Sequence, residues 1–298
     1  MTAEQAVTVP EWTVQKDGPV ATVVFGTVEK PPQHTLDHHM SLAVALEAVR
    51  FDDSVRVVVI TGREGGIFEL GPRRGESNPY PAQALNPAGR PGGSGAIRGP
   101  WSLSQGLERA FTTLALMEKP VIGRLNGDAY AIAVHALWGS DVIVAIEDVL
   151  ICDTHLAMHP TLPFGKTPGD GAFAFLSLFL TPTKLKELLL LGSTWTAKDL
   201  ADLGVINYAV PSTALDGKVS EMIDAFLARP PLPLIRTKRA INKRLLEQLN
   251  LTMDYARLSQ QCDLWELAAT GFRQEMTLRA EEPPWTLSPT STEQGLGE

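Results

Sequence analysis

The stretch Lys119–Ile151, KPVIGRLNGDAYAIAVHALWGSDVIVAIEDVLI, decides the fold. Its first apolar run ends at the turn-forming pair Asn126-Gly127, which predicts a short strand followed by a turn. Residues 131–140 are mostly apolar and predict a short helix, and the run DVIVA that begins at Asp141 predicts a second strand. Strand, helix and strand in succession indicate an α/β protein.

The same alternation continues on the amino-terminal side of this stretch. Val20–Phe25 (VATVVF) and Val55–Thr61 (VRVVVIT) predict buried strands, and Leu103–Met117 predicts a helix. Between the two strands, four apolar residues mark one face of a further helix: Leu42, Ala45, Leu46 and Val49. Together these segments predict a strand, helix and strand unit ahead of the central stretch.

Helix and strand signals also follow the central stretch. Thr183–Leu191 predicts a helix opened by a Thr-Pro-Thr sequence. Thr196 predicts the N-cap of a helix that ends at Gly204, and Val205–Val210 predicts a strand. The α/β alternation therefore extends to about residue 211.

Beyond that point the chain changes character, and we expect three parts. Residues 1–211 form an α/β core, in which the Pro-, Gly- and Ser-rich residues 76–100 are a flexible loop or lid. Residues 212–282 form a C-terminal helical subdomain, and residues 283–298 are a disordered tail. Three prolines separate the two predicted helices of this subdomain, the second of which runs from Leu234 to about Ala269: Pro230, Pro231 and Pro233.

Composition excludes several classes of protein. The chain is 44% hydrophobic and 20% charged, as ordinary globular proteins are, and its formal net charge is -8. That charge gives no electrostatic basis for binding nucleic acid or an anionic membrane. The first residues, MTAEQAVTVPEWTVQ, lack a basic segment followed by an apolar one, so we expect a cytoplasmic protein.

The cysteines and two of the histidines do not suggest a metal site. Cys152 and Cys262 lie 110 positions apart without a CxxC partner, and we expect both to be small buried side chains rather than a disulfide or zinc ligands. His155 and His159 are four positions apart, but the following Pro160 indicates a loop rather than a helix. No metal is therefore expected.

The order of these motifs resembles the crotonase (enoyl-CoA hydratase/isomerase) superfamily over roughly residues 12 to 275. This resemblance implies an α/β fold: a spiral of ββα units with a C-terminal helical subdomain that assembles homotrimers or dimers of trimers (hexamers). The motifs that carry it are VRVVVITG, the Lys119-Pro120 and Asn126-Gly127 pairs, Asp141, PGDG at Pro168–Gly171, LLLLGSTWTAKDLADLGVINYAVP and IRTKRAIN.

The resemblance implies an enolate intermediate whose oxyanion is held by two backbone N–H groups. One donor falls at about Ile132. The other falls on Pro72, which has no N–H, so that Gly71 or Arg73 donates instead, or this half of the oxyanion hole is missing. Arg73 and Arg74 also resemble contacts to the phosphates of coenzyme A.

The acid and base positions differ from those of hydratases in this superfamily, which carry two glutamates. Here the first position is His135 and the second is Thr161. Asp170 falls where naphthoate synthases and oxocamphor hydrolase carry an aspartate, and His39 falls where oxocamphor hydrolase, a retro-Claisen enzyme, has a functional histidine. We therefore expect His135, Asp170 and His39 to be catalytic and Thr161, Trp138 and Arg73 to bind substrate.

Each of these residues also has a purely structural interpretation. Asp170 precedes an apolar segment and can be the N-cap of a helix beginning near Gly171. His135 and Trp138 can be core residues of a short helix. His39 belongs to a polar helix start, and Arg73 can be a solvated surface charge.

Two enzymatic functions and one alternative remain. The first enzyme acts on an acyl-CoA thioester as a hydratase, isomerase or lyase, and the second is a hydrolase that cleaves a carbon–carbon bond of a β-dicarbonyl compound with water. The alternative is an inactive binding or assembly subunit. Neither enzyme requires a cofactor, apart from coenzyme A as part of the substrate, and the expected partners are a small carbonyl compound or acyl-CoA and further copies of the chain.

Overall fold

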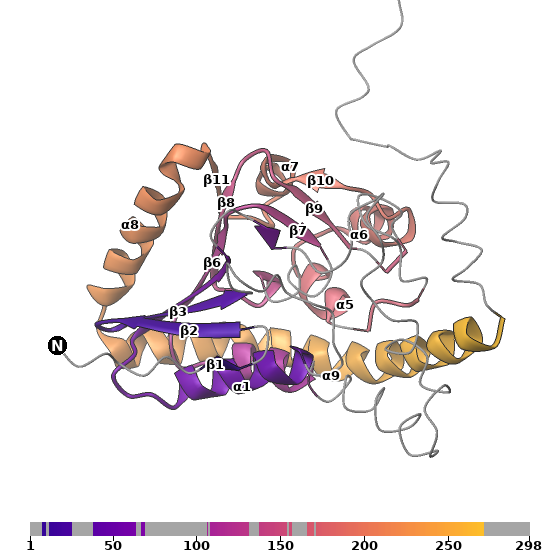
Figure 1. Ribbon diagram of the computed structural model, residues 1–298, viewed down its shortest axis with the longest axis horizontal. Coiled ribbons are helices and arrows are strands. Elements are labelled where there is room, and N and C mark those ends of the chain that lie inside the picture. Colours follow the sequence, from indigo (N-terminus) through magenta and orange to yellow (C-terminus); the bar gives the residue numbers. More distant parts are fainter. Residues whose placement is uncertain are drawn as a thin grey trace, which may run out of the picture.

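The computed structural model (Figure 1) describes residues 8–9, 12–25, 38–63, 67–68, 106, 108–130, 137–153, 155–156, 166–169 and 171–270. The expected loop at 76–100 and the expected tail at 283–298 lie outside these residues.

The strands form two sheets. The first sheet has seven strands in the order β1-β2-β3-β4-β6-β8-β11 and the second has four in the order β10-β9-β7-β5. The strands of the first sheet are β1 (Thr8–Val9), β2 (Trp12–Asp17), β3 (Val20–Phe25), β4 (Val57–Gly62), β6 (Val121–Leu125), β8 (Val142–Ile146) and β11 (Tyr208–Val210). Those of the second are β5 (Ile67–Phe68), β7 (Asp128–Tyr130), β9 (Leu150–Cys152) and β10 (Trp195–Thr196).

The helices pack against the sheets, and the described elements of the C-terminal part are all helices. The described helices are α1 (His38–Arg50), α5 (Ala172–Leu176), α6 (Pro182–Leu190), α7 (Ala197–Asp202), α8 (Leu215–Leu227) and α9 (Pro231–Thr270). A helix over residues 108–116 and a short 3-10 helix over Ser212–Ala214 complete the set. As expected, every described element after residue 211 is helical. None of the described helices is long and apolar enough to cross a membrane.

Strand β4 shows why the sequence forms a buried parallel sheet. All six of its residues, VVVITG, are buried, and it lies between the parallel strands β3 and β6. Val58 and Ile60 face the main hydrophobic core, whereas Val57 and Val59 face a second cluster that α8 covers with Leu215 and Val219. A strand buried on both faces needs a continuous apolar run rather than an alternating one.

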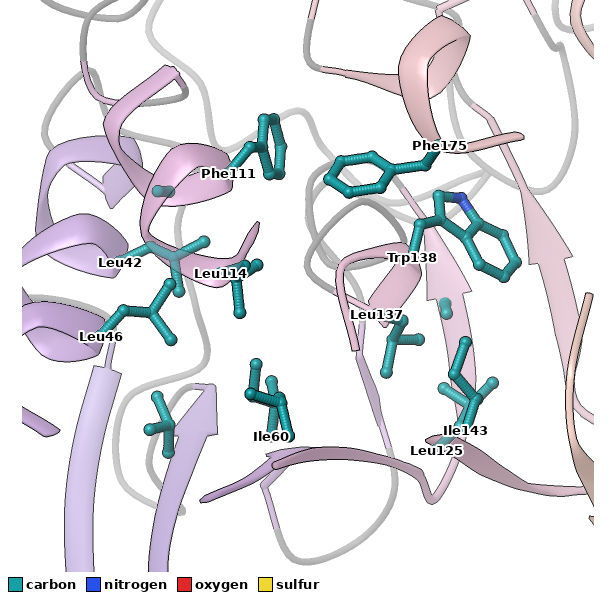
Figure 2. Close-up of a cluster of buried hydrophobic side chains, with 14 of the residues drawn as sticks. Leu42, Leu46, Ile60, Phe111, Leu114, Leu125, Leu137, Trp138, Ile143 and Phe175 are labelled. Atoms are coloured by element: carbon teal, nitrogen blue, oxygen red, sulfur yellow. The ribbon is translucent and has the colours of Figure 1, made fainter. Parts of the chain in front are cut away.

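The main core lies between α1, the helix at 108–116, α5 and the sheets (Figure 2). Leu42 and Leu46 of α1 are fully buried, as the helical face predicted. Phe111 and Phe175 meet edge to face with ring centroids 5.3 Å apart. This aromatic contact joins the helix at 108–116 to α5.

Helix α6 opens at the expected Thr-Pro-Thr sequence, and the predicted N-cap of α7 is confirmed. Thr181 is the N-cap of α6 and accepts from the backbone N–H of Lys184 at 3.4 Å, with Pro182 at the first helical position. Thr196 and Asp199 form a capping box at the start of α7. Gly204 follows this helix with φ 78°, a conformation that favours glycine.

Three expectations about these elements are corrected. The strand β11 begins at Tyr208 rather than at Val205, because the backbone N–H groups of Val205 and Ile206 donate to the carbonyl of Leu200 at the end of α7. Helix α9 begins at Pro231, since proline fits the first turn of a helix, where the N–H groups have no intrahelical partner. Cys262 is exposed rather than buried.

Candidate active site

The carboxyl ends of three parallel strands meet at one edge of the four-stranded sheet. β7 pairs in parallel with β5 on one side and with β9 on the other. The chain leaves β5 toward Gly71, β7 toward Ile132 and His135, and β9 toward Asp153. Ligands of α/β proteins bind at the carboxyl ends of parallel strands, so this edge is the candidate site.

Asn126 ties together the turns that follow β4 and β6. Its Nδ2 donates to the carbonyls of Gly62 at 3.3 Å and Arg63 at 2.9 Å, and its Oδ1 accepts from Thr61 Oγ1 at 3.4 Å. Arg124 Nη1 also donates to Thr61 Oγ1, at 3.0 Å. One side chain of the Asn-Gly turn therefore holds two strand ends at a set distance.

The end of β9 carries no nucleophilic thiol. Cys152 is fully buried, and burial raises the pKa of its thiol to about 12. The thiol therefore stays protonated near neutral pH and behaves as the small buried side chain that the sequence predicted.

A buried polar cluster follows β9. Asp153 Oδ1 accepts from the backbone N–H of His155 at 2.9 Å and lies 2.7 Å from His155 Nδ1. On the other side of the ring, Nε2 of His155 lies 3.3 Å from Gln260 Nε2 of α9. His155 is 2% exposed and both of its ring nitrogens face protein groups, so the imidazole is not open to a substrate.

The structure leaves most predicted site residues untested. Six of them lie outside the described residues: Gly71, Arg73, Ile132, His135, Thr161 and Asp170. The backbone of His39 lies in the first turn of α1, but its side chain is not among those described. Their roles remain predictions.

The structural interpretation of Asp170 needs a correction. The N-cap position of α5 falls on Gly171, which has φ 89° and makes no side-chain capping bond. Asp170 precedes that position by one residue and is therefore not the N-cap.

Trp138 lies in the hydrophobic core and is 3% exposed. In Figure 2 its indole lies below Phe175, on the side of Leu137 that faces away from α1. It also lines a cavity of about 450 Å³ with Phe175 and Lys238, at the amino-terminal ends of β6 and β8. A role for Trp138 in substrate binding stays a prediction.

Sequence reasoning missed the partners of His155. The spacing Asp153-Thr-His155 was a usable signal, because an aspartate two residues before a histidine can bind both its backbone and its ring. No signal pointed to Gln260, which comes from a distant helix. Within the described ranges, no group of three or more histidine, cysteine or acidic side chains could hold a metal ion.

Comparisons with known proteins place these features in context. Residues 99–262 match the family model described as enoyl-CoA hydratase/isomerase. The chain is 25% identical over 228 residues to a carnitinyl-CoA dehydratase from Salmonella arizonae, which covers 75% of this chain and 77% of that protein.

Solved structures show the same arrangement of elements. An enoyl-CoA hydratase/isomerase from Mycobacterium paratuberculosis superposes with a TM-score of 0.72 at 19% identity, over 91% of this chain and 98% of that one. A β-diketone hydrolase from the cyanobacterium Anabaena, bound to (S)-3-oxocyclohexyl acetic acid, gives a TM-score of 0.70 at 21% identity, over 87% and 95% of the two chains.

Proposed function

The chain belongs to the enoyl-CoA hydratase/isomerase family, and on that premise we propose that it acts on an acyl-CoA thioester through an enolate. The proteins it resembles are a dehydratase, a hydratase/isomerase and a hydrolase, all of them enzymes. The substrate brings its own coenzyme A, and the proposed reaction needs no other cofactor.

The pairing of β5 with β7 is the observation that carries this proposal. Phe68 of β5 stands opposite Ala129 of β7, so the two strands end side by side. Gly71 follows the end of β5 by three residues and Ile132 follows the end of β7 by two. Two backbone N–H groups aimed at one oxyanion require such neighbouring strand ends, and Asn126 fixes the turn before β7.

In this proposal Asp170 moves the proton that forms or quenches the enolate, and His135 is the second acid or base. General acid–base groups of this kind each contribute about 10²–10⁴ in rate. Thr161 and Arg73 bind the substrate, Arg73 at a phosphate of coenzyme A. Gly171 takes the N-cap position of α5, which Asp170 precedes by one residue.

A second candidate is hydrolysis of a β-dicarbonyl compound, favoured by the histidine and threonine that stand where hydratases have glutamates. Water activated by His135 or Asp170 adds to one carbonyl. The carbon–carbon bond then breaks to give a carboxylate and an enolate, and His39 or the other group protonates the enolate carbon. The structural likeness to a β-diketone hydrolase is compatible with this chemistry.

Calorimetry with purified protein separates these candidates. Coenzyme A, acetoacetyl-CoA and a free cyclic 1,3-diketone are titrated in parallel, and turnover of each carbonyl compound is then followed. Binding and turnover of the thioester support the first candidate, whereas binding and cleavage of the diketone alone support the second. Failure of both acetoacetyl-CoA and the diketone to bind contradicts both enzymes and leaves the assembly subunit.

The variants Asp170→Ala and His135→Ala complete the test. In either enzyme each substitution lowers kcat by about 10²-fold or more. Unchanged turnover in both variants would remove these two residues from the mechanism.

A further inference from the structure

Helix α9 touches the segment that leads to Asp170 at two points, nearly one helical turn apart. Asp263 Oδ2 accepts from the backbone N–H of Thr167 at 2.5 Å. The side chain of Gln260 fills the space beside Gly169, where a Cβ atom would lie 2.7 Å from both Cδ and Oε1 of Gln260. The backbone at Gly169 therefore rests directly against Gln260, one residue before Asp170.

Gln260 is itself held from the other side by His155. Asp153 Oδ1 lies 2.7 Å from Nδ1 of His155, and Nε2 of the same ring lies 3.3 Å from Gln260 Nε2. Asp153, His155 and Gln260 are 5%, 2% and 1% exposed, and hydrogen bonds are stronger in such a water-poor interior. The backbone N–H of Lys166 also donates to the carbonyl of His155, at 3.3 Å, which joins the two segments again.

We propose that His155 and Gln260 are positioning residues, which set the backbone of Gly169–Gly171 and thereby aim the side chain of Asp170. The inference rests on the proposed function, because that function gives Asp170 its task. It goes further by making α9 part of the machinery that orients the acid–base group.

Neither residue is assigned a chemical step. Nε2 of His155 faces Gln260 rather than an open site, and Gln260 has no titratable group. Their effect is geometric, and a displacement of about 1 Å at a reacting group can cost about 100-fold in rate.

Gln260→Leu tests this role, with Asn242→Leu as its matched control. Both residues lie on α9, and each makes one side-chain hydrogen bond to a group of the core. Asn242 lies eighteen residues before Gln260 on this helix, and its Nδ2 donates to the carbonyl of Ala115 at 2.9 Å, away from the loop at Gly169. We expect Gln260→Leu to lower kcat about 10–100-fold while KM changes little, since Gln260 is assigned no contact with the substrate. Asn242→Leu should leave kcat within about 2-fold of the wild type, at a similar loss of Tm.

Gly169→Ala approaches the same contact from the loop side. The added methyl group cannot fit 2.7 Å from Gln260, so the loop or the glutamine must move. Its control is Gly217→Ala on α8, where nothing lies within 4 Å of the new methyl group. We expect kcat to fall in Gly169→Ala and to stay unchanged in Gly217→Ala, even if Gln260→Leu fails to fold.

Hydrogen exchange of the backbone amides of residues 166–171 gives a readout that needs no activity. Exchange should rise there in Gln260→Leu and not in Asn242→Leu. If the wild type turns over neither carbonyl compound, the proposed function fails while this measurement still decides the positioning role. Equal exchange in the two variants, or raised exchange with an unchanged kcat in an active enzyme, overturns the inference.

Discussion

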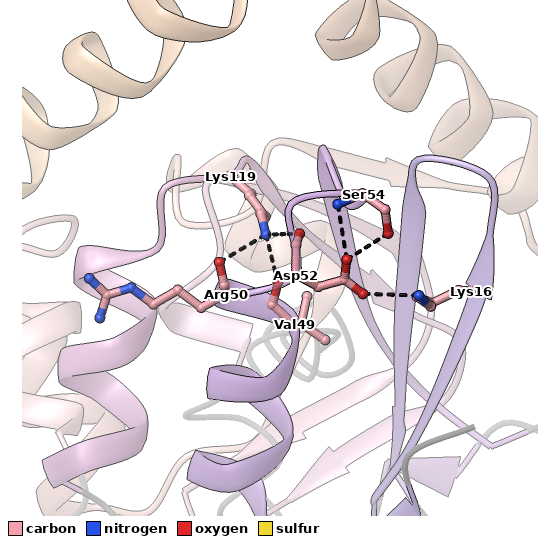
Figure 3. A network of polar contacts seen from close by, with 6 residues as sticks. All are labelled: Lys16, Val49, Arg50, Asp52, Ser54 and Lys119. Carbon is pink, nitrogen blue, oxygen red and sulfur yellow. Dashed lines mark hydrogen bonds and ion pairs between the residues drawn. The ribbon is translucent and has the colours of Figure 1, made fainter. Parts of the chain in front are cut away.

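Asp52 is a residue whose charge is stabilised by three groups around it (Figure 3). The hydroxyl and backbone N–H of Ser54 donate to Oδ1 at 2.6 and 2.9 Å, and Lys16 Nζ lies 2.9 Å from Oδ2. These bonds, that of the Ser54 hydroxyl first, lower the pKa of Asp52 from 3.8 to about 2. The ionised form of Asp52 is therefore more stable, relative to the protonated form, in the folded state than in the unfolded state.

The resulting prediction concerns stability and pH. A lowered folded-state pKa contributes stability above pH 3.8, and this contribution is lost as pH falls toward 2. Because the side chain is 29% exposed, solvent weakens the effect, and we expect Asp52→Ala to cost about 1 kcal/mol of unfolding free energy at pH 7. Urea unfolding at pH 7 and pH 3 should show the cost shrinking at the lower pH. The control Asp202→Ala, at an exposed aspartate, should cost less unfolding free energy at both pH values. If the cost of Asp52→Ala grew from pH 7 to pH 3, the lowered pKa of Asp52 would be contradicted.

Two glycines on different elements should respond in opposite directions to alanine. Gly217 lies exposed in α8 with open space around a new methyl group, and alanine there should stabilise the protein by about 0.5–1 kcal/mol. Gly123 lies in β6, where a Cβ would meet Leu137 at 3.0 Å and Ser140 at 3.1 Å. Alanine at 123 should destabilise, and thermal unfolding of the two variants checks the sign.

At the scale of elements, the side chain of Lys119 caps the C-terminal end of helix α1. Its Nζ donates to the carbonyls of Val49 at 2.7 Å, Arg50 at 2.9 Å and Asp52 at 2.6 Å (Figure 3). The last carbonyls of a helix have no intrahelical partner, and a cation there satisfies them and the helix dipole. Burial lowers the pKa of Lys119, so the ammonium depends on these three carbonyls for compensation.

Replacing this lysine should therefore be costly. Lys119→Met keeps the length of the side chain but leaves buried carbonyls unpaired, and we expect a loss of about 2–4 kcal/mol in unfolding free energy. Urea unfolding measures it, with the exposed Lys198→Met as the control. A loss below that of the control would mean that water replaces the ammonium at these carbonyls.

Another lysine ties the C-terminal helix to the core. Lys238 of α9 donates to Asp141 Oδ2 at 2.6 Å and to the carbonyl of Lys119 at 2.8 Å, and Asp141 also accepts from the N–H of Val121 at 2.7 Å. Burial raises the pKa of Asp141 and lowers that of Lys238, and each charge opposes the other's shift. Asp141 and Lys238, a residue of the motif IRTKRAIN, are therefore held in one buried pair.

At the scale of the whole molecule, the crotonase-type α/β fold expected from the sequence is confirmed by structures that superpose over about nine tenths of the chain. The oligomer is still a proposal. Leu251, Tyr255 and Leu258 lie on one face of α9 and are 73%, 75% and 64% exposed. We propose that copies of the chain cover this face in a homotrimer or a dimer of trimers.

Sedimentation velocity tests this assembly. The wild type should sediment as three or six copies, and the double variant Leu251→Glu with Leu258→Glu should shift toward monomer, because two buried charges oppose association. Phe51→Glu, at an equally exposed phenylalanine, is the control and should not change the mass. A monomeric wild type would contradict the proposal.

The elements were predictable where the pattern is local. The β-rich run of β4, the apolar face of α1 and the cap residues Thr181 and Thr196 each act through near neighbours in the chain. The start of β11 was not predictable, because the contacts of Val205 and Ile206 with the end of α7 decide it.

The sequence by itself determined the buried strands β3, β4, β6 and β8, the family resemblance and the choice of candidate residues, because periodicity, turn residues and motif order are properties of the chain. Only the tertiary structure decided that β5, β7 and β9 end at one edge, that Asn126 fixes the turns there and that His155 faces Gln260. His155 and Gln260 are 105 positions apart, and no local pattern reports a contact that folding alone creates.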